Sequence, residues 1–115
     1  MMYLRNRVAS VKYALNGIRI VLKSQHNAWI HVVATVGVCG AGFYLRLTKL
    51  EWSIIVLTIT LVWMAETFNT ALEFLADATC PHYHPLVGKA KDVAAGAVML
   101  TAMGSVIIAL IILIT

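Results

Sequence analysis

The chain has 115 residues, of which 61% are hydrophobic and only 12% are charged, with a net charge of +4. Soluble domains average about 25% charged and about 45–50% apolar residues, so this composition excludes a disordered chain and argues against a soluble globule. The length allows one domain, and the class that fits is a small integral membrane protein.

The first predicted element is an amphipathic helix at about 4–24. Its apolar residues recur at helical steps of three and four, at Val8, Val11, Leu15, Ile18 and Leu22. Cationic residues line an adjacent face, at Arg5, Lys12, Arg19 and Lys23. We expect this helix to lie on the inner leaflet, with its cationic side chains reaching the lipid head groups. The alternative is a basic anchor with no part in any chemistry.

Three membrane-spanning helices are predicted next, at about 28–46, 50–76 and 90–115. No charged residue occurs from Ser24 to Leu45 or from Val93 to Thr115. Each of these runs exceeds the about 20 residues that cross a hydrocarbon core. The middle span is uncharged from Trp52 to Ala65. Small residues recur at four-residue steps in the third span and cluster in the first, which favours close packing of the helices. Three helices alone enclose little of a site, so we expect a bundle completed by further copies of the chain.

The distribution of cations predicts the orientation. Five Lys and Arg residues precede the first span, and Lys89 and Lys91 precede the third. The positive-inside rule then places the N-terminus and the loop at 78–88 in the cytoplasm and the C-terminus outside. Cys39 and Cys80 fall in a span and in that cytoplasmic loop, so we interpret both as free thiols.

An acidic stripe distinguishes the second span. It consists of Glu66, Asn69, Thr70, Glu73 and Asp77, which fall within about 100° of arc on one helical face. Ionisable groups at membrane depth cost at least about 2.5–3.5 kcal/mol each, so the stripe requires a function or a partner. If the hydrocarbon core begins near Leu50, it ends near Glu66. The acidic stripe is therefore expected to begin at the cytoplasmic interface and to extend from there into water.

Three interpretations of the acidic stripe compete: a polar contact between helices, a carboxylate-gated cation or proton path, and phosphoryl transfer to a lipid alcohol. The loop at 80–92 favours the last, because its histidines, tyrosine and lysines suit a nucleotide better than the mouth of a transport path. A P-loop is not present, since Gly88-Lys89 lacks the upstream glycine and the following Ser or Thr. His82 and His84 alone do not predict a zinc site.

Two segments resemble the prokaryotic diacylglycerol kinase and undecaprenol kinase family. They are Glu66-Thr-Phe-Asn-Thr-Ala-Leu-Glu-Phe-Leu-Ala-Asp77 and Tyr83-His-Pro-Leu-Val-Gly-Lys-Ala-Lys-Asp-Val-Ala-Ala-Gly-Ala-Val98. The resemblance runs from about Lys12 to the C-terminus. It implies a multi-pass homotrimer in a prokaryotic inner or plasma membrane, a single lipid kinase domain per chain, and active sites between subunits at the cytoplasmic face. It also implies transfer of the γ-phosphate of ATP to a lipid hydroxyl with Mg²⁺.

The resemblance further implies roles for individual residues. Glu66 matches the general base and, with Arg19, a lipid contact, while Asn69 supports the catalytic site. Glu73 and Gln25 match the metal ligands. The expected ATP contacts are Tyr13, Gln25, Glu73, His82, Tyr83, His84, Lys91 and Asp92.

Gln25 departs from the family pattern, which has a glutamate at this position. A neutral amide oxygen binds Mg²⁺ without adding charge, so we expect a weakened metal or ATP contact. Diacylglycerol, phosphorylated to phosphatidate, is the leading substrate, and undecaprenol is the runner-up. The expected partners are ATP, a membrane lipid alcohol, the bilayer and further copies of the chain, with no nucleic acid.

Overall fold

The computed structural model describes residues 2–114, and the described chain is entirely helical and loop. Its four helices are α1 (Met2–Ser24), α2 (His26–Leu45), α3 (Lys49–Thr79) and α4 (Pro85–Ile114). Three helical segments are long and apolar enough to cross a membrane: Asn27–Leu45, Lys49–Thr79 and Pro85–Ile114. The predicted all-α class with three candidate spans is therefore confirmed.

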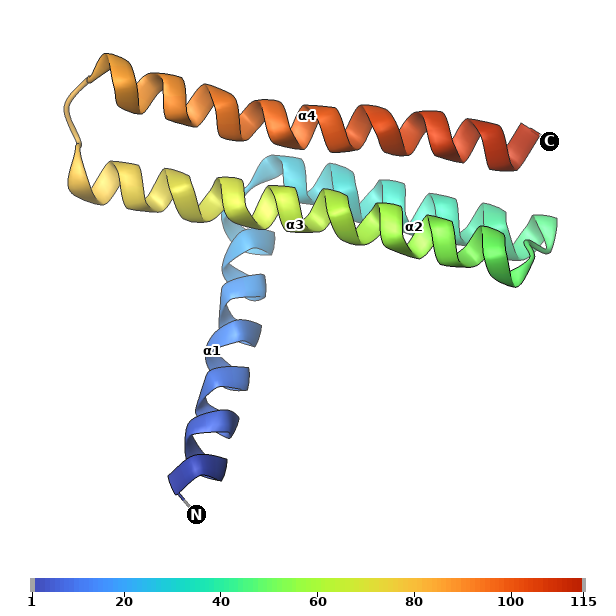
Figure 1. Cartoon of the computed structure of the whole chain (residues 1–115), viewed down its shortest axis with the longest axis horizontal. Coiled ribbons are helices and arrows are strands. Elements are labelled where there is room, and N and C mark those ends of the chain that lie inside the picture. The colour runs from blue at the N-terminus through green and yellow to red at the C-terminus, as the bar shows by residue number, and fades with distance from the viewer. Residues whose placement is uncertain (1, 115) are drawn as a thin grey trace.

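The helices α2, α3 and α4 lie side by side, and α3 makes its most extensive contact with α4 (Figure 1). Helix α1 runs crosswise to them and meets α2 and α3 only near its C-terminal end. Val21, close to that end, is buried, whereas most of α1 is exposed. The placement of α1 on the inner leaflet stays a prediction.

Helix α4 begins at Pro85, earlier than the predicted start near residue 90. Proline is suited to the first position of a helix because its backbone lacks an N–H and its φ is already helical. The ring of His84 supports this start, since its Nδ1 accepts a hydrogen bond from the Leu86 N–H at 3.1 Å. The charged residues before Val93 therefore belong to α4 itself, as an extension beyond its uncharged part.

A tight turn joins α2 to α3. Arg46 adopts a left-handed backbone conformation (φ 54°), and the Leu47 N–H donates to the Gly42 carbonyl at 3.2 Å. Thr48 and Glu51 form a capping box at the start of α3, each accepting a hydrogen bond from the backbone N–H of the other. The turn holds α2 and α3 antiparallel.

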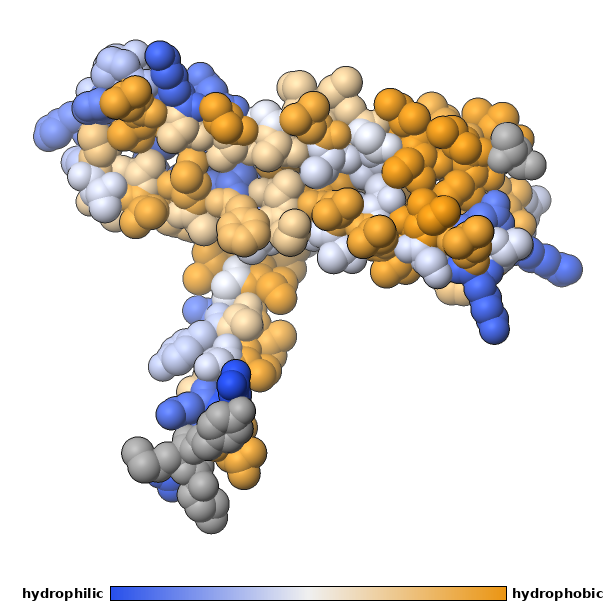
Figure 2. All heavy atoms as spheres, viewed as in Figure 1, coloured by the Kyte–Doolittle hydropathy of each residue, from blue (hydrophilic) through white to orange (hydrophobic). Residues whose placement is uncertain are grey.

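The surface of the three-helix layer is mostly apolar. Figure 2 shows hydrophobic side chains over much of this layer, with hydrophilic ones gathered at its two ends and along α1. Such an exposed apolar surface suits lipid rather than water. Buried residues concentrate instead on one side of α3, and they include the polar residues Thr58, Glu66, Asn69 and Thr70.

Candidate active site

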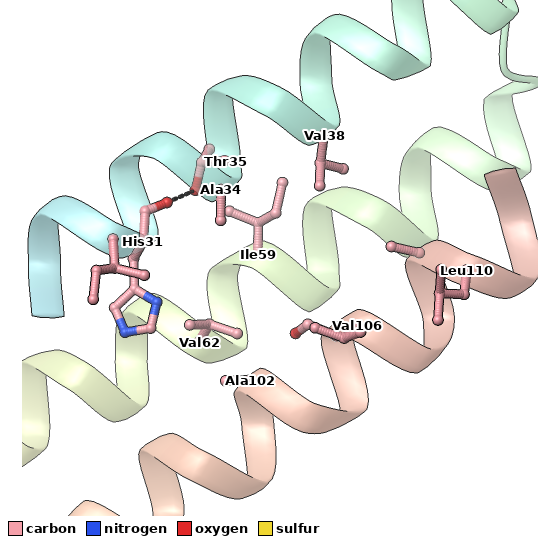
Figure 3. Close-up of a pocket in the computed structure, with 12 residues that line it drawn as sticks. His31, Ala34, Thr35, Val38, Ile59, Val62, Ala102, Val106 and Leu110 are labelled. Carbon is pink, nitrogen blue, oxygen red and sulfur yellow. Dashed lines mark hydrogen bonds between the residues drawn. The ribbon is translucent and has the colours of Figure 1, made fainter.

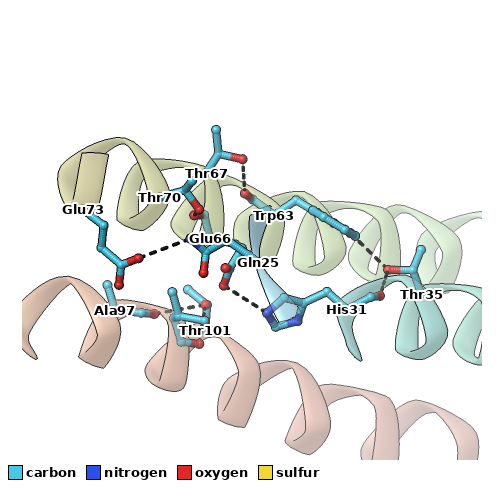
Figure 4. Close-up of polar contacts among 11 residues, drawn as sticks. Gln25, His31, Thr35, Trp63, Glu66, Thr67, Thr70, Glu73, Ala97 and Thr101 are labelled. Atoms are coloured by element: carbon cyan, nitrogen blue, oxygen red, sulfur yellow. Dashed lines mark hydrogen bonds and ion pairs between the residues drawn. The ribbon is translucent and has the colours of Figure 1, made fainter. Parts of the chain in front are cut away.

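The side chain of Glu66 is completely buried within the single chain. Its Oε2 lies 3.4 Å from Nε2 of His31, which comes from α2 and is itself only 12% exposed (Figure 4). Neither carboxylate oxygen of Glu66 has a hydrogen-bond partner among the described residues, and the same holds for Oδ1 of the buried Asn69 one turn away. These unsatisfied acceptors are the first sign of a site that binds a ligand.

Gln25 and Glu73 form a second polar contact in the same region. The Gln25 Nε2 donates to Glu73 Oε2 at 3.2 Å, across 48 positions of sequence. Gln25 lies in the short break between α1 and α2, so this break brings it against α3. Glu73 follows Glu66 by two helical turns, about 10 Å along the axis of α3.

The donor set around Glu73 suits Mg²⁺ in part. A carboxylate and an amide supply hard oxygen ligands, and Mg²⁺ commonly uses one or two carboxylates together with phosphate oxygens of its substrate. Within residues 2–114, no group of three or more His, Cys, Asp and Glu side chains lies close enough to hold a metal ion. A Mg²⁺ ion bound at Glu73 would therefore need further ligands, from ATP or from another subunit.

Several contacts of α2 with α3 fix the position of His31. Its ring meets Trp63 edge-on, with the ring centroids 5.8 Å apart. The Trp63 Nε1–H donates to Thr35 Oγ1 at 3.1 Å, and the Thr35 hydroxyl donates to the His31 carbonyl at 2.6 Å. Sequence reasoning missed His31. The available signal was an imidazole near the start of the first span, in a charge-free run that also contains His26.

The nucleotide contacts predicted near the α3–α4 loop are not gathered around Glu66. Lys91 Nζ forms an ion pair with Asp77 Oδ1 at 2.7 Å, which ties α4 to α3. The remaining predicted residues are exposed: Tyr13 and Arg19 on α1, His82, Tyr83 and His84 in the loop, and Asp92 on α4. If these residues share a site with Glu66, a bound nucleotide or a neighbouring subunit has to complete it.

A cavity of about 320 Å³ lies between α2, α3 and α4 (Figure 3). Most of its lining is apolar, with Val38, Ile59 and Leu110 among the residues that face it. His31 lines one end of the cavity and also contacts Glu66, so the apolar space adjoins the buried carboxylate. Its apolar lining suits a hydrocarbon chain.

The sequence profile of prokaryotic diacylglycerol kinase matches residues 12–113 of the chain. The chain belongs to the prokaryotic diacylglycerol kinase family. The diacylglycerol kinase of Synechocystis sp. is 39% identical over 104 residues, which cover 90% of this chain and 59% of that protein. The undecaprenol kinase of Bacillus subtilis is 39% identical over 103 residues, covering 90% of this chain and 84% of that protein.

The diacylglycerol kinase of Haemophilus influenzae is more distant, at 28% identity over 93 residues. Membership of the family assigns the chain to the lipid kinases, a class of phosphotransferases that work in the membrane. The three apolar helices agree with this assignment. The resemblance expected from the acidic stripe and the loop after it is thereby confirmed.

Proposed function

We propose that this diacylglycerol kinase family member transfers the γ-phosphate of ATP to the hydroxyl of diacylglycerol, which gives phosphatidate. The observation that carries the proposal is the buried Glu66 carboxylate, whose oxygens lack hydrogen-bond partners among the described residues. Glu66 lies between the Gln25–Glu73 contact and an apolar cavity, so a phosphate site and a lipid-tail site meet at one carboxylate.

The proposed mechanism depends on positioning and charge, as phosphoryl transfer does generally. Glu66 accepts the proton of the lipid hydroxyl as that oxygen attacks the γ-phosphorus. Asn69 orients the reacting groups through its amide. Glu73 and the Gln25 amide oxygen would hold Mg²⁺, which would supply neutralisation of the phosphate charge. Lys91 leaves its ion pair with Asp77 and binds the phosphates of ATP instead.

The proposed setting is a homotrimer in a prokaryotic inner or plasma membrane. The α3–α4 loop and the N-terminus face the cytoplasm in this proposal, since cations concentrate before the first span and before the third. The C-terminus lies outside. Helix α1 then runs along the inner leaflet, which agrees with its crosswise direction relative to the three spans.

Undecaprenol is the second candidate substrate. It is favoured by the Bacillus subtilis relative named for it, of which the alignment covers 84%. Diacylglycerol and undecaprenol both present a primary alcohol beneath long hydrocarbon chains, so the apolar cavity suits either. Comparing kcat/KM for the two lipids separates them, and a large preference for undecaprenol would overturn the diacylglycerol assignment.

The deciding experiment measures phosphate transfer from labelled ATP to each lipid, with purified protein, mixed micelles and Mg²⁺. The Glu66→Gln variant keeps the size of the side chain but removes the base, so we expect its kcat to fall by about 10²–10⁴-fold. The matched control is Glu51→Gln, which changes the capping glutamate at the other end of α3 and leaves transfer intact.

Two results would contradict the proposal. Undiminished transfer by Glu66→Gln would remove the proposed role of this carboxylate. If the wild-type chain phosphorylates neither lipid but passes cations or protons in liposomes, and Glu66→Gln and Glu73→Gln change that flux, the acidic stripe serves a carboxylate-gated path instead.

A further inference from the structure

His31 and Glu66 contact each other, and each side chain has at least one buried polar atom that lacks a hydrogen-bond partner within residues 2–114. The described residues include four such atoms: His31 Nε2, both carboxylate oxygens of Glu66, and Oδ1 of Asn69, which lies one turn further along α3. A buried carboxylate without donors is costly, and the 3.4 Å separation is slightly longer than an ordinary hydrogen bond. A small rotation of either side chain closes the gap and satisfies one donor and one acceptor.

The ring of His31 is held in the orientation that this contact requires. Trp63 packs against the ring edge-on, and its indole is tied back to α2 through Thr35 (Figure 4). The nitrogen that faces Glu66 is Nε2. Since a carboxylate accepts hydrogen bonds, the imidazole tautomer that suits this arrangement carries its proton on Nε2.

We propose that His31 is a positioning residue for the reaction, because its Nε2–H donates to Glu66 Oε2 and leaves Oε1 to receive the lipid hydroxyl. This inference rests on the proposed kinase function. In the step it serves, the hydroxyl proton moves to Glu66 Oε1 and the lipid oxygen bonds to the γ-phosphorus. The bond from that phosphorus to the bridging oxygen of ADP breaks, and ADP leaves.

His31 also connects the carboxylate with the lipid. It lines the end of the apolar cavity next to Glu66, so a hydrocarbon chain in the cavity brings its hydroxyl end toward this pair. Without a hydrogen bond from His31, the carboxylate of Glu66 is free to rotate, and neither oxygen stays directed at the substrate. A misplacement of about 1 Å can cost about 100-fold in rate, which sets the scale of the effect expected from His31.

Two amide substitutions test the inference because they differ by one methylene group. In His31→Gln the amide nitrogen reaches about as far as Nε2, whereas in His31→Asn it ends near the place of Nδ1. We expect His31→Gln to keep kcat within about threefold, and His31→Asn to lower it by about 100-fold. The KM for ATP stays unchanged, because His31 is not among the proposed ATP contacts.

Two further variants separate positioning from packing. His31→Phe keeps an aromatic edge for Trp63 but has no donor, so it should lose kcat like His31→Asn while the thermal stability stays close to that of wild type. In a Glu66→Gln background, His31→Asn should cause no further loss of kcat, because the group that it positions is gone.

A measurement without turnover completes the test. The ¹⁵N chemical shifts of the imidazoles, with the His31 signals identified by their absence in His31→Gln, should report a proton on Nε2. The signal should move in Glu66→Gln and stay in Glu51→Gln. The opposite tautomer would overturn the inference, as would equal kcat values for His31→Gln and His31→Asn.

The proposed function and the inference fail in different ways. If the wild-type chain transfers no phosphate to either lipid, the proposed function fails and the positioning role falls with it. If wild type is active and all His31 variants match it, the kinase function stands and the inference alone is wrong.

Discussion

Gln25 places a neutral amide, instead of a carboxylate, at the proposed Mg²⁺ site. Its amide donates to Glu73 at 3.2 Å, so a neutral side chain already faces the proposed metal-binding carboxylate. We predict that Gln25→Glu lowers the Mg²⁺ concentration at half-maximal activity by about tenfold, because a second anionic oxygen strengthens binding of the cation. The measurement is a Mg²⁺ titration of ATP-dependent lipid phosphorylation.

The same variant should lose stability when Mg²⁺ is removed, since two carboxylates then face each other without a cation between them. Asn27→Asp is the matched control because it adds the same charge at an exposed position two residues further along. An equal shift of the Mg²⁺ midpoint in this control would show that general charge, and not the contact with Glu73, produces the effect.

Residues on one helical face were predictable, whereas contacts between helices were not. The spacing of Glu66, Asn69 and Glu73 fixes their common face from the sequence, because a helix has a constant period. His31 gives no periodic signal of its own, and it becomes notable only when α2 packs on α3. The Lys91–Asp77 pair likewise depends on the antiparallel packing of α3 and α4.

At the scale of helices, the α2–α3 turn depends on Gly42. A Cβ atom at this position would lie 2.8 Å from the Trp52 ring, which is itself packed on Phe43 with the ring centroids 4.9 Å apart. We predict that Gly42→Ala lowers the free energy of unfolding by about 1–3 kcal/mol, the range for overpacked sites. Thermal unfolding in detergent, followed by circular dichroism, measures the loss.

Gly40→Ala is the control for this prediction, because a Cβ there meets nothing within 4 Å in the described structure. The two substitutions add the same methyl group to the same helix, two residues apart. Equal losses from both would mean that the helical backbone, and not the approach of Trp52, is sensitive to the change.

For the whole molecule, hydropathy was enough to predict the three spans, and the crosswise direction of α1 agrees with the amphipathic helix expected at about 4–24 (Figure 1). A charge-free run of about 20 residues has few stable alternatives to a membrane helix. The packing of α1 near the buried Val21, by contrast, leaves no pattern along the chain. Residues 2–114 hold no group of three or more His, Cys, Asp and Glu side chains close enough to bind a metal ion, so the proposed Mg²⁺ site needs ligands beyond those of one chain.

The proposed orientation predicts which ends of the spans meet each side of the membrane. Cys80 lies directly after α3, and Lys49 is exposed at the opposite end of that helix. In a Cys39→Ala background, we expect a membrane-impermeant maleimide to label Cys80 only after the cells are opened. A Lys49→Cys, Cys80→Ala variant should be labelled in intact cells. The reverse pattern would place the α3–α4 loop outside and contradict a cytoplasmic ATP site.

The homotrimer implied by the family resemblance is the last prediction, together with an active site shared between subunits. Tyr13 and Arg19 lie exposed on α1, which runs crosswise to the three-helix layer that contains Glu66 and Glu73 (Figure 1). If they serve a kinase site, that site belongs in part to another subunit. We therefore expect a native protein mass in detergent of three times the 12.6 kDa chain.

Mixing subunits tests whether the site is shared. Glu66→Gln and Arg19→Ala change different helices, and we expect each variant to be inactive alone. When the two are unfolded, mixed and reassembled, some interfaces combine an intact α3 from one chain with an intact α1 from its neighbour. Activity should then return, because such interfaces hold every group that the reaction requires. A fully active monomer, or mixtures that stay inactive, would instead place the complete site within one chain.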